Sequence, residues 1–171
     1  MKQFICYSAL VACIVALLYF AYLVSYEPIS TIILVRHAER LNDTDTTSLS
    51  PQGRERASVL KHVLVSADVN RVYVTDKVRT GQTAQPTADL FNLTPSQITG
   101  NATDRFVDSI HAHRGKVIFI VGHSDTVPEI ISKLGVIPPP AIPREVYDDL
   151  FVVTLSRFRA KLAHLKYGKP T

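Results

Sequence analysis

Residues 32–40 read IILVRHAER, an apolar run that ends in an arginine followed by a histidine. The run Thr31–Val35 predicts a strand that is apolar on both faces, as in the centre of a parallel sheet. In open α/β sheets the carboxyl ends of the strands line the ligand crevice, so Arg36 and His37 are predicted to lie in a binding site. Arginine suits phosphate oxygens, and histidine can act as nucleophile, acid or base near neutral pH. The stretch therefore indicates phosphoryl chemistry.

Composition limits the classes of function that remain. The chain has 171 residues, 46% of them hydrophobic, which suits one domain with a short appendage. The net charge of +4 is spread without a run of like charges, so a nucleic-acid partner is not expected and small anionic ligands fit better. The two cysteines, Cys6 and Cys13, both lie in the first apolar segment. The rest of the chain therefore has no disulfide, thiol nucleophile or cysteine metal site.

The N-terminal segment predicts a membrane anchor, residues 1–26. Phe4–Val24 contains no charge, and a helix of this length spans about 30 Å, the thickness of a bilayer core. Lys2 before the segment and Glu27 after it favour a cytoplasmic N-terminus and a domain on the extracytoplasmic side. A cleaved signal peptide with secretion, or a lipoprotein acylated at Cys13, stays open as an alternative.

Residues 27–171 are predicted to form one catalytic domain in which strands and helices alternate. Helices are expected at Pro51–Val65, Val78–Phe91, Ala102–His113 and Thr126–Leu134, and strands at Thr31–Val35, Arg71–Thr75, Lys116–Val121, Asp149–Leu155 and Lys161–Tyr167, with a short one within Thr94–Gly100. This alternation predicts an α/β fold, a three-layer α/β/α sandwich with a mostly parallel sheet, closed by the antiparallel final pair.

Three strands are each followed by a residue suited to anion binding. Arg36 and His37 follow the first strand, Arg79 opens the helix after the second, and His123 follows the third. Because parallel neighbours end at the same edge of a sheet, these four side chains are expected to surround one anion-sized hollow. A phosphoryl group fits such donors. Gly122 is expected to let the backbone approach closely and to leave room for the substrate.

These residues resemble the histidine phosphatase superfamily, also called the phosphoglycerate-mutase-like family. The resemblance rests on Arg36-His37-Ala38, on Leu49–Gly53 (LSPQG), on Arg79 before Thr83-Ala84, and on Gly122-His123. It implies that His37 attacks phosphorus and becomes phosphohistidine, and that Arg36, Arg79 and His123 bind the phosphoryl oxygens. It implies no metal and no cofactor. The small size of the chain points to the single-domain phosphatases of this family.

The general acid departs from the family pattern. The family's usual glutamate after the second arginine region is missing, since residues 85–97 offer only Asp89. Another branch uses an aspartate directly after the second histidine, whereas here Ser124 intervenes before Asp125. Asp125 is the first candidate acid and Glu39 the second. A phosphoramidate substrate such as phosphohistidine needs less help, because its leaving nitrogen is readily protonated.

The leading hypothesis is a membrane-held phosphoric monoester hydrolase of the histidine acid phosphatase type, acting on a small phosphorylated molecule or a phosphoprotein. Two alternatives stay open: a catalytically impaired phosphate-binding scaffold, and a phosphoglycerate-type mutase. Tyr147–Asp149 is interpreted as the start of an edge strand rather than as part of the site.

Overall fold

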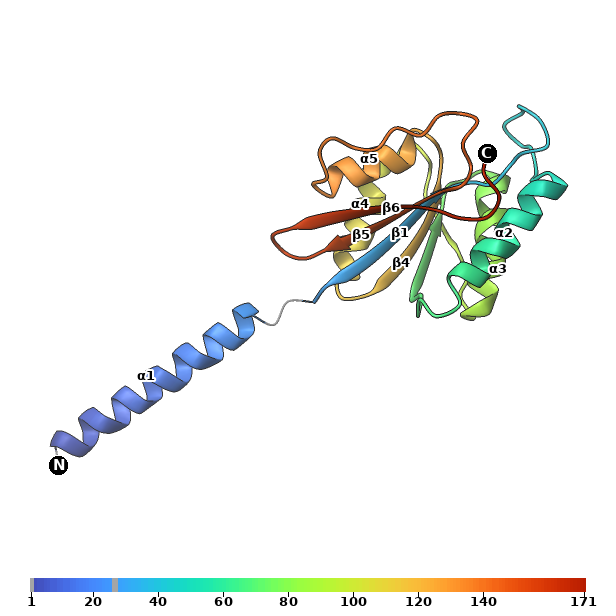
Figure 1. The fold of residues 1–171 in the computed structure, drawn as a ribbon. Helices are drawn as coiled ribbons and strands as arrows, with labels where there is room; N and C mark the ends of the chain where they lie inside the picture. Colours follow the sequence, from blue (N-terminus) through green and yellow to red (C-terminus); the bar gives the residue numbers. More distant parts are fainter. Residues whose placement is uncertain (1, 26–27) are drawn as a thin grey trace.

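The computed structural model describes residues 2–25 and 28–171, and the helices and strands follow the predicted order (Figure 1). The elements are α1 (Lys2–Ser25), β1 (Ser30–Arg36), α2 (Pro51–Val63), β2 (Arg71–Val74), α3 (Val78–Leu90), β3 (Ser96–Gln97), α4 (Thr103–Ala112), β4 (Val117–Gly122), α5 (Thr126–Lys133), β5 (Asp149–Leu155) and β6 (Ala160–Lys166). Most predicted boundaries agree to within two residues. Helix α2 begins as predicted, because the hydroxyl of Ser50 accepts from the backbone of Gly53 and Pro51 is the first helical residue.

The six strands form one sheet in the order β3-β2-β4-β1-β5-β6. Strand β1 lies near the middle, parallel to β4 and antiparallel to β5. Strand β2 is parallel to both β4 and β3, whereas β6 is antiparallel to β5. The sheet is thus mixed but mostly parallel. Strands β1, β2 and β4 all end at one edge, which is where the predicted site residues follow them.

Apolar residues on both faces of the central strands build two separate cores. On one face, Ile32 and Leu34 of β1 pack with Phe106 of α4 and Ile130 of α5. On the other, Ile33 and Val35 of β1 pack beneath α2 and α3. Figure 1 shows the same division, with α4 and α5 covering one face of the sheet and α2 and α3 the other. The predicted three-layer sandwich is confirmed.

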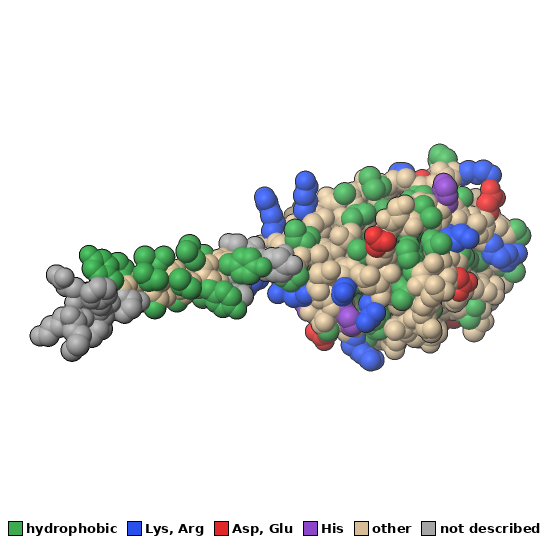
Figure 2. All heavy atoms as spheres, turned by 90° about the horizontal axis from the view of Figure 1, so that it is seen from below, with side chains coloured by type: hydrophobic (Ala, Val, Ile, Leu, Met, Phe, Trp, Pro, Cys, Tyr) green, Lys and Arg blue, Asp and Glu red, His purple; other side chains and the backbone are tan. Residues whose placement is uncertain are grey.

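Helix α1 forms over the segment predicted to be a membrane anchor. Its described apolar side chains, such as Leu10, Leu17 and Phe20, are exposed, and Figure 2 shows them along the helix that projects from the domain. Counting only the residues that the structure describes, no helix is long and apolar enough to qualify as a membrane span. The predicted transmembrane helix therefore finds no support there. Glu27, used to predict the orientation, lies outside the described residues.

Candidate active site

Strand β1 delivers Arg36 and His37 to the edge of the sheet. Arg36 pairs with Gly122, the last residue of β4, and the backbone amide of His37 donates to the Gly122 carbonyl at 3.0 Å. His123 follows directly, so the two histidines lie side by side, with ring centroids 5.3 Å apart and planes inclined by 67°. The pairing of β1 with β4 thus brings together two residues that are far apart in the sequence.

The ring of His37 is held in one orientation. Its Nδ1 lies 2.8 Å from the Ala38 carbonyl oxygen. Because a carbonyl can only accept, Nδ1 carries the proton of the neutral ring and Nε2 carries the lone pair. The backbone amide of Ala38 donates to the hydroxyl of Thr83 at 3.0 Å, which fixes this turn against α3. The buried ring therefore presents a nucleophilic nitrogen, Nε2.

Two guanidinium groups in the site have donors that lack a partner. Arg36 and Arg79 are only 4% and 7% exposed. Nη1 of Arg36 donates to the carbonyls of Pro143 and Val146, both at 3.0 Å, and Nη1 of Arg79 donates to the Asp45 carbonyl at 3.0 Å. In both arginines, Nε is buried without a hydrogen-bond partner in the described part of the chain. A buried N–H group without an acceptor is costly, and an oxyanion would supply one.

These side chains line an open polar cavity of about 810 Å³. Arg36, His37, Arg79 and His123 all contribute to its wall, so the structure brings together the four residues predicted to meet. The rim adds three cations, Arg40, Lys77 and Arg144, and four carboxylates, Asp43, Asp76, Asp125 and Glu129. The cavity is much larger than a phosphoryl group and its rim carries both signs of charge. It therefore has room for a polar leaving group of considerable size.

Burial and neighbouring charge keep both histidines neutral when the cavity is empty. Burial lowers the pKa of His37 to about 3, helped by Arg36, His123 and Arg79 and opposed by the hydrogen bond to Ala38. Burial also lowers the pKa of His123 to about 4; Arg79 and Arg36 add to this, and Asp125 opposes it. A neutral imidazole is the nucleophilic form of histidine. The site thus combines an available lone pair with two cationic groups.

The first candidate acid, Asp125, is stabilised as a carboxylate. Burial alone would raise the pKa of Asp125, but hydrogen bonds from Thr126, whose backbone amide donates at 2.7 Å, lower it below its usual value. Asp125 lines the cavity and caps α5. Its assignment as general acid stays a prediction, and its lowered pKa weighs against it.

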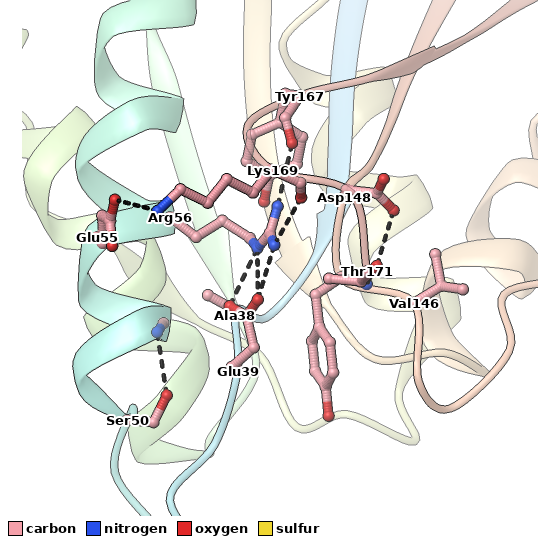
Figure 3. Close-up of polar contacts among 12 residues, drawn as sticks. Ala38, Glu39, Ser50, Glu55, Arg56, Val146, Asp148, Tyr167, Lys169 and Thr171 are labelled. Carbon is pink, nitrogen blue, oxygen red and sulfur yellow. Dashed lines mark hydrogen bonds and ion pairs between the residues drawn. The ribbon is translucent and has the colours of Figure 1, made fainter.

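The second candidate, Glu39, is used in the fold. Figure 3 shows its carboxylate meeting the guanidinium of Arg56, with Nε donating to both carboxylate oxygens at 2.8 and 3.0 Å. Arg56 also donates to the carbonyls of Tyr167 and Lys169, so the pair fastens the C-terminal segment to α2. Asp89, the only carboxylate of residues 85–97, lines a different groove and accepts from Gln85. Neither residue reaches the cavity.

Two glycines have close-packing roles. A Cβ on Gly53 would lie 2.2 Å from the Glu39 carbonyl oxygen, so this position cannot hold a larger residue without movement of the backbone. A Cβ on Gly122 would lie 3.0 Å from a methyl group of Val127. The close approach expected at Gly122 is thus that of α5 to β4, and its role in leaving room for the substrate stays a prediction.

Tyr147 belongs to the site, although the sequence predicted only the start of a strand there. The guanidinium carbon of Arg36 lies 4.2 Å from the centre of the Tyr147 ring, and the ring of His37 lies 5.9 Å away. Tyr147 precedes β5, and β5 pairs antiparallel with β1, with Val35 opposite Leu150. Because of this pairing, Tyr147, just before β5, lies beside Arg36 and His37 at the end of β1. The ring helps to fix the arginine over the cavity.

The fold is that of known phosphatases. The protein histidine phosphatase SixA, in a structure with tungstate, has a TM-score of 0.61 and 17% identity over 80% of this chain and 96% of its own. A phosphoserine phosphatase from Entamoeba histolytica, solved with 3-phosphoglyceric acid, has a TM-score of 0.61 and 13% identity, over 83% of this chain and 98% of its own. A mycobacterial glucosyl-3-phosphoglycerate phosphatase has a TM-score of 0.63 and 10% identity, over 81% of this chain and 98% of its own. No curated protein matches the sequence closely enough to count as a relative.

Part of the sequence also matches a known family. The model of the histidine phosphatase superfamily (branch 1) matches residues 32–105, which include Arg36, His37 and Arg79. Over that stretch the sequence is similar to this superfamily.

Proposed function

We propose that this protein is a metal-independent phosphatase that hydrolyses a phosphate monoester or a phosphoramidate through a phosphohistidine on His37. One observation carries the proposal. The Nε2 lone pair of His37 is fixed by the bond from Nδ1 to Ala38, beside two buried guanidinium groups whose Nε atoms lack an acceptor. A phosphoryl group would accept from both arginines while its phosphorus faces Nε2.

The reaction has two steps. Nε2 of His37 donates its electron pair to phosphorus, and the bond from phosphorus to the leaving oxygen or nitrogen breaks with its pair on the leaving atom, which takes up a proton. Water then attacks phosphorus, the P–N bond returns its pair to Nε2, and the proton of water leaves to solvent or to a base. Arg36 and Arg79 neutralise the charge on the phosphoryl oxygens in both steps.

The state of the carboxylates favours substrates that need little acid catalysis. Asp125 is held ionised and Glu39 is paired with Arg56, so neither readily supplies a proton to a basic alkoxide. A phosphoramidate leaves through a nitrogen that is already easily protonated. The substrate of this protein can be a small molecule or a phosphoprotein, since the cavity is open and polar. We therefore expect phosphohistidine to be hydrolysed faster than a serine phosphate.

Turnover assays test the proposal. The purified chain should hydrolyse para-nitrophenyl phosphate and a histidine-phosphorylated peptide with EDTA present. His37→Ala should abolish both activities, and His62→Ala, at an exposed histidine of α2, should retain them. If the folded chain turns over neither substrate, the proposal that it is an enzyme is wrong. The alternative is then a catalytically impaired phosphate-binding scaffold, which agrees with the lack of a proton-donating carboxyl group at Asp125 or Glu39.

The location of the domain on the extracytoplasmic side is a separate prediction. It rests on the charges that flank the N-terminal apolar segment, Lys2 and Glu27. A reporter fused to the C-terminus, active on only one side of the membrane, tests it. A reporter active in the cytoplasm would contradict the prediction.

A further inference from the structure

A chain of hydrogen bonds runs from the second histidine of the site into the body of the protein. Nε2 of His123 lies 2.9 Å from the hydroxyl oxygen of Thr75, which lies 3.0 Å from that of Thr80. The hydroxyl of Thr80 in turn lies 2.7 Å from the Lys77 carbonyl and 3.1 Å from the Thr75 carbonyl. Both threonines are fully buried. Solvent therefore does not reach either threonine hydroxyl.

The carbonyls at the end of this chain determine the direction of every bond. A carbonyl can only accept, so the single proton of the Thr80 hydroxyl points to the carbonyls of Lys77 and Thr75. The Thr80 oxygen then accepts from Thr75, whose own proton is used in that bond. The oxygen of Thr75 can consequently only accept from His123. Nε2 of His123 must carry a proton, and in the neutral ring Nδ1 carries the lone pair.

Packing places that lone pair on the ring edge opposite Gly100. A Cβ built on Gly100 would lie 3.7 Å from Cδ2 of His123 and 3.6 Å from the methyl group of Thr75. The Cδ2 edge of the ring therefore faces Gly100, and Nδ1 lies on the opposite edge. His123 lines the cavity. A neutral Nδ1 would oppose an anionic phosphoryl oxygen with a lone pair, whereas a protonated Nδ1 would donate to it.

We propose that Thr75 and Thr80 are positioning residues that hold His123 in the Nε2–H form, so that a dianionic phosphoryl group binds together with one proton on Nδ1. This inference rests on the proposed function for the identity of the ligand. The proton comes from solvent as the dianion enters and returns when phosphate leaves, so the balance over one cycle is zero. The imidazolium then donates from both nitrogens, to Thr75 and to the phosphoryl group.

The charges around His123 agree with this coupling. The groups that act on its charge are Arg36 from β1, Lys77 and Arg79 at the start of α3, and Asp125 before α5, with His37 in ring contact. The three cations oppose a positive ring when the cavity is empty. A bound dianion offsets them, and the balance then favours the imidazolium.

Nuclear magnetic resonance of the full chain labelled with ¹⁵N-histidine tests the positioning role directly. Long-range ¹H–¹⁵N spectra distinguish the two neutral forms of each ring. We expect His123 to be in the Nε2–H form in the ligand-free protein and in Thr75→Ser, and to be a mixture in Thr75→Val. Thr87→Val is the matched control, since Thr87 is also buried on α3 but its hydroxyl has no partner within the described residues.

Calorimetry of tungstate binding tests the coupled proton. Tungstate is a dianion at pH 8, and titrations in two buffers of different ionisation enthalpy give the number of protons taken up. We expect uptake close to one proton in the wild type and in Thr87→Val, and binding about 10-fold weaker in Thr75→Val, the loss of about one hydrogen bond. In the spectra of the tungstate complex, both nitrogens of His123 should be protonated.

Several results would overturn the inference. They are an Nδ1–H form of His123 in the wild type, an unchanged Nε2–H form in Thr75→Val, or tungstate binding without proton uptake. If Thr75→Val fails to fold, Thr80→Val and the wild-type spectrum still decide the matter. The form of His123 is measured without substrate. A chain that shows the Nε2–H form and the proton uptake but no turnover would therefore refute the phosphatase and not this inference.

Discussion

His37, which is buried, and His123, which is half-buried, should make the ligand-free protein sensitive to acid. Burial lowers the pKa of His37 to about 3 and that of His123 to about 4, from 6.5 in the unfolded chain. Above pH 6.5 both rings are neutral in either state and contribute no pH dependence. Below pH 6.5 the unfolded chain binds protons that the folded chain does not, so the free energy of unfolding decreases as pH falls, until the folded rings titrate near pH 4 and 3.

The size of the effect follows from these values. Each ring lowers the free energy of unfolding by about 1.4 kcal/mol for every pH unit below about 6. Between pH 7.5 and pH 5 the loss is about 2 kcal/mol for each ring and about 4 kcal/mol for both, a large share of the stability of a domain. Bound tungstate should raise the free energy of unfolding, since it binds only the folded chain.

Urea unfolding at several pH values between 7.5 and 5 measures this dependence. The double variant His37→Asn/His123→Asn should lose about 4 kcal/mol less than the wild type over that interval. His62→Asn, an exposed histidine outside the site, is the control and should follow the wild type. If the double variant keeps the full wild-type dependence, the two site histidines are not buried in neutral form and the reasoning about the nucleophile is wrong.

Three further substitutions give distinct outcomes. Arg79→Lys keeps the charge but loses the forked N–H groups of the guanidinium. We expect kcat/KM on an aryl phosphate to fall about 100-fold, with an unchanged circular dichroism spectrum. A loss of less than about 3-fold would contradict the role of Arg79 in binding the phosphoryl group. Glu39→Gln leaves the buried charge of Arg56 without its partner, so it should lower the free energy of unfolding in urea by about 3 kcal/mol. The pH–rate profile of aryl phosphate hydrolysis should not change. An altered profile would identify Glu39 as the general acid. Gly53→Ala places a methyl group against the Glu39 carbonyl and should lower stability by about 1–3 kcal/mol in the same assay, and an unchanged midpoint would refute the close packing.

Local sequence patterns were enough to predict the fold and the four central residues of the site. Residues 32–35 of β1 and 117–121 of β4 are apolar at every position, which identifies these strands as central strands with helices on both faces. Each of these strands stops at a residue of a different character, Arg36 or Gly122, so the ends could be placed to within a residue. Because parallel neighbours share an edge, the meeting of His37 with His123 followed from topology alone.

The remaining parts of the site depend on contacts that no local pattern records. Tyr147 reaches Arg36 only because β5 pairs with β1, and the sequence placed β5 beside β6 without placing it beside β1. Glu39 was the second candidate acid, whereas its carboxylate accepts from Arg56, a residue of α2. The hydroxyl chain from His123 through Thr75 likewise needs three segments in contact. Such pairings are set by packing between distant elements.

The central claim is that Nε2 of His37 forms the bond to phosphorus. The most direct measurement is to mix the chain with ³²P-labelled phosphoramidate, quench in alkaline denaturant within one turnover, and identify the labelled atom by peptide mapping and comparison with both phosphohistidine isomers. The predicted result is label on Nε2 of His37, absent from His37→Ala. Label on Nδ1, label on another residue, or turnover without a labelled protein would contradict the account.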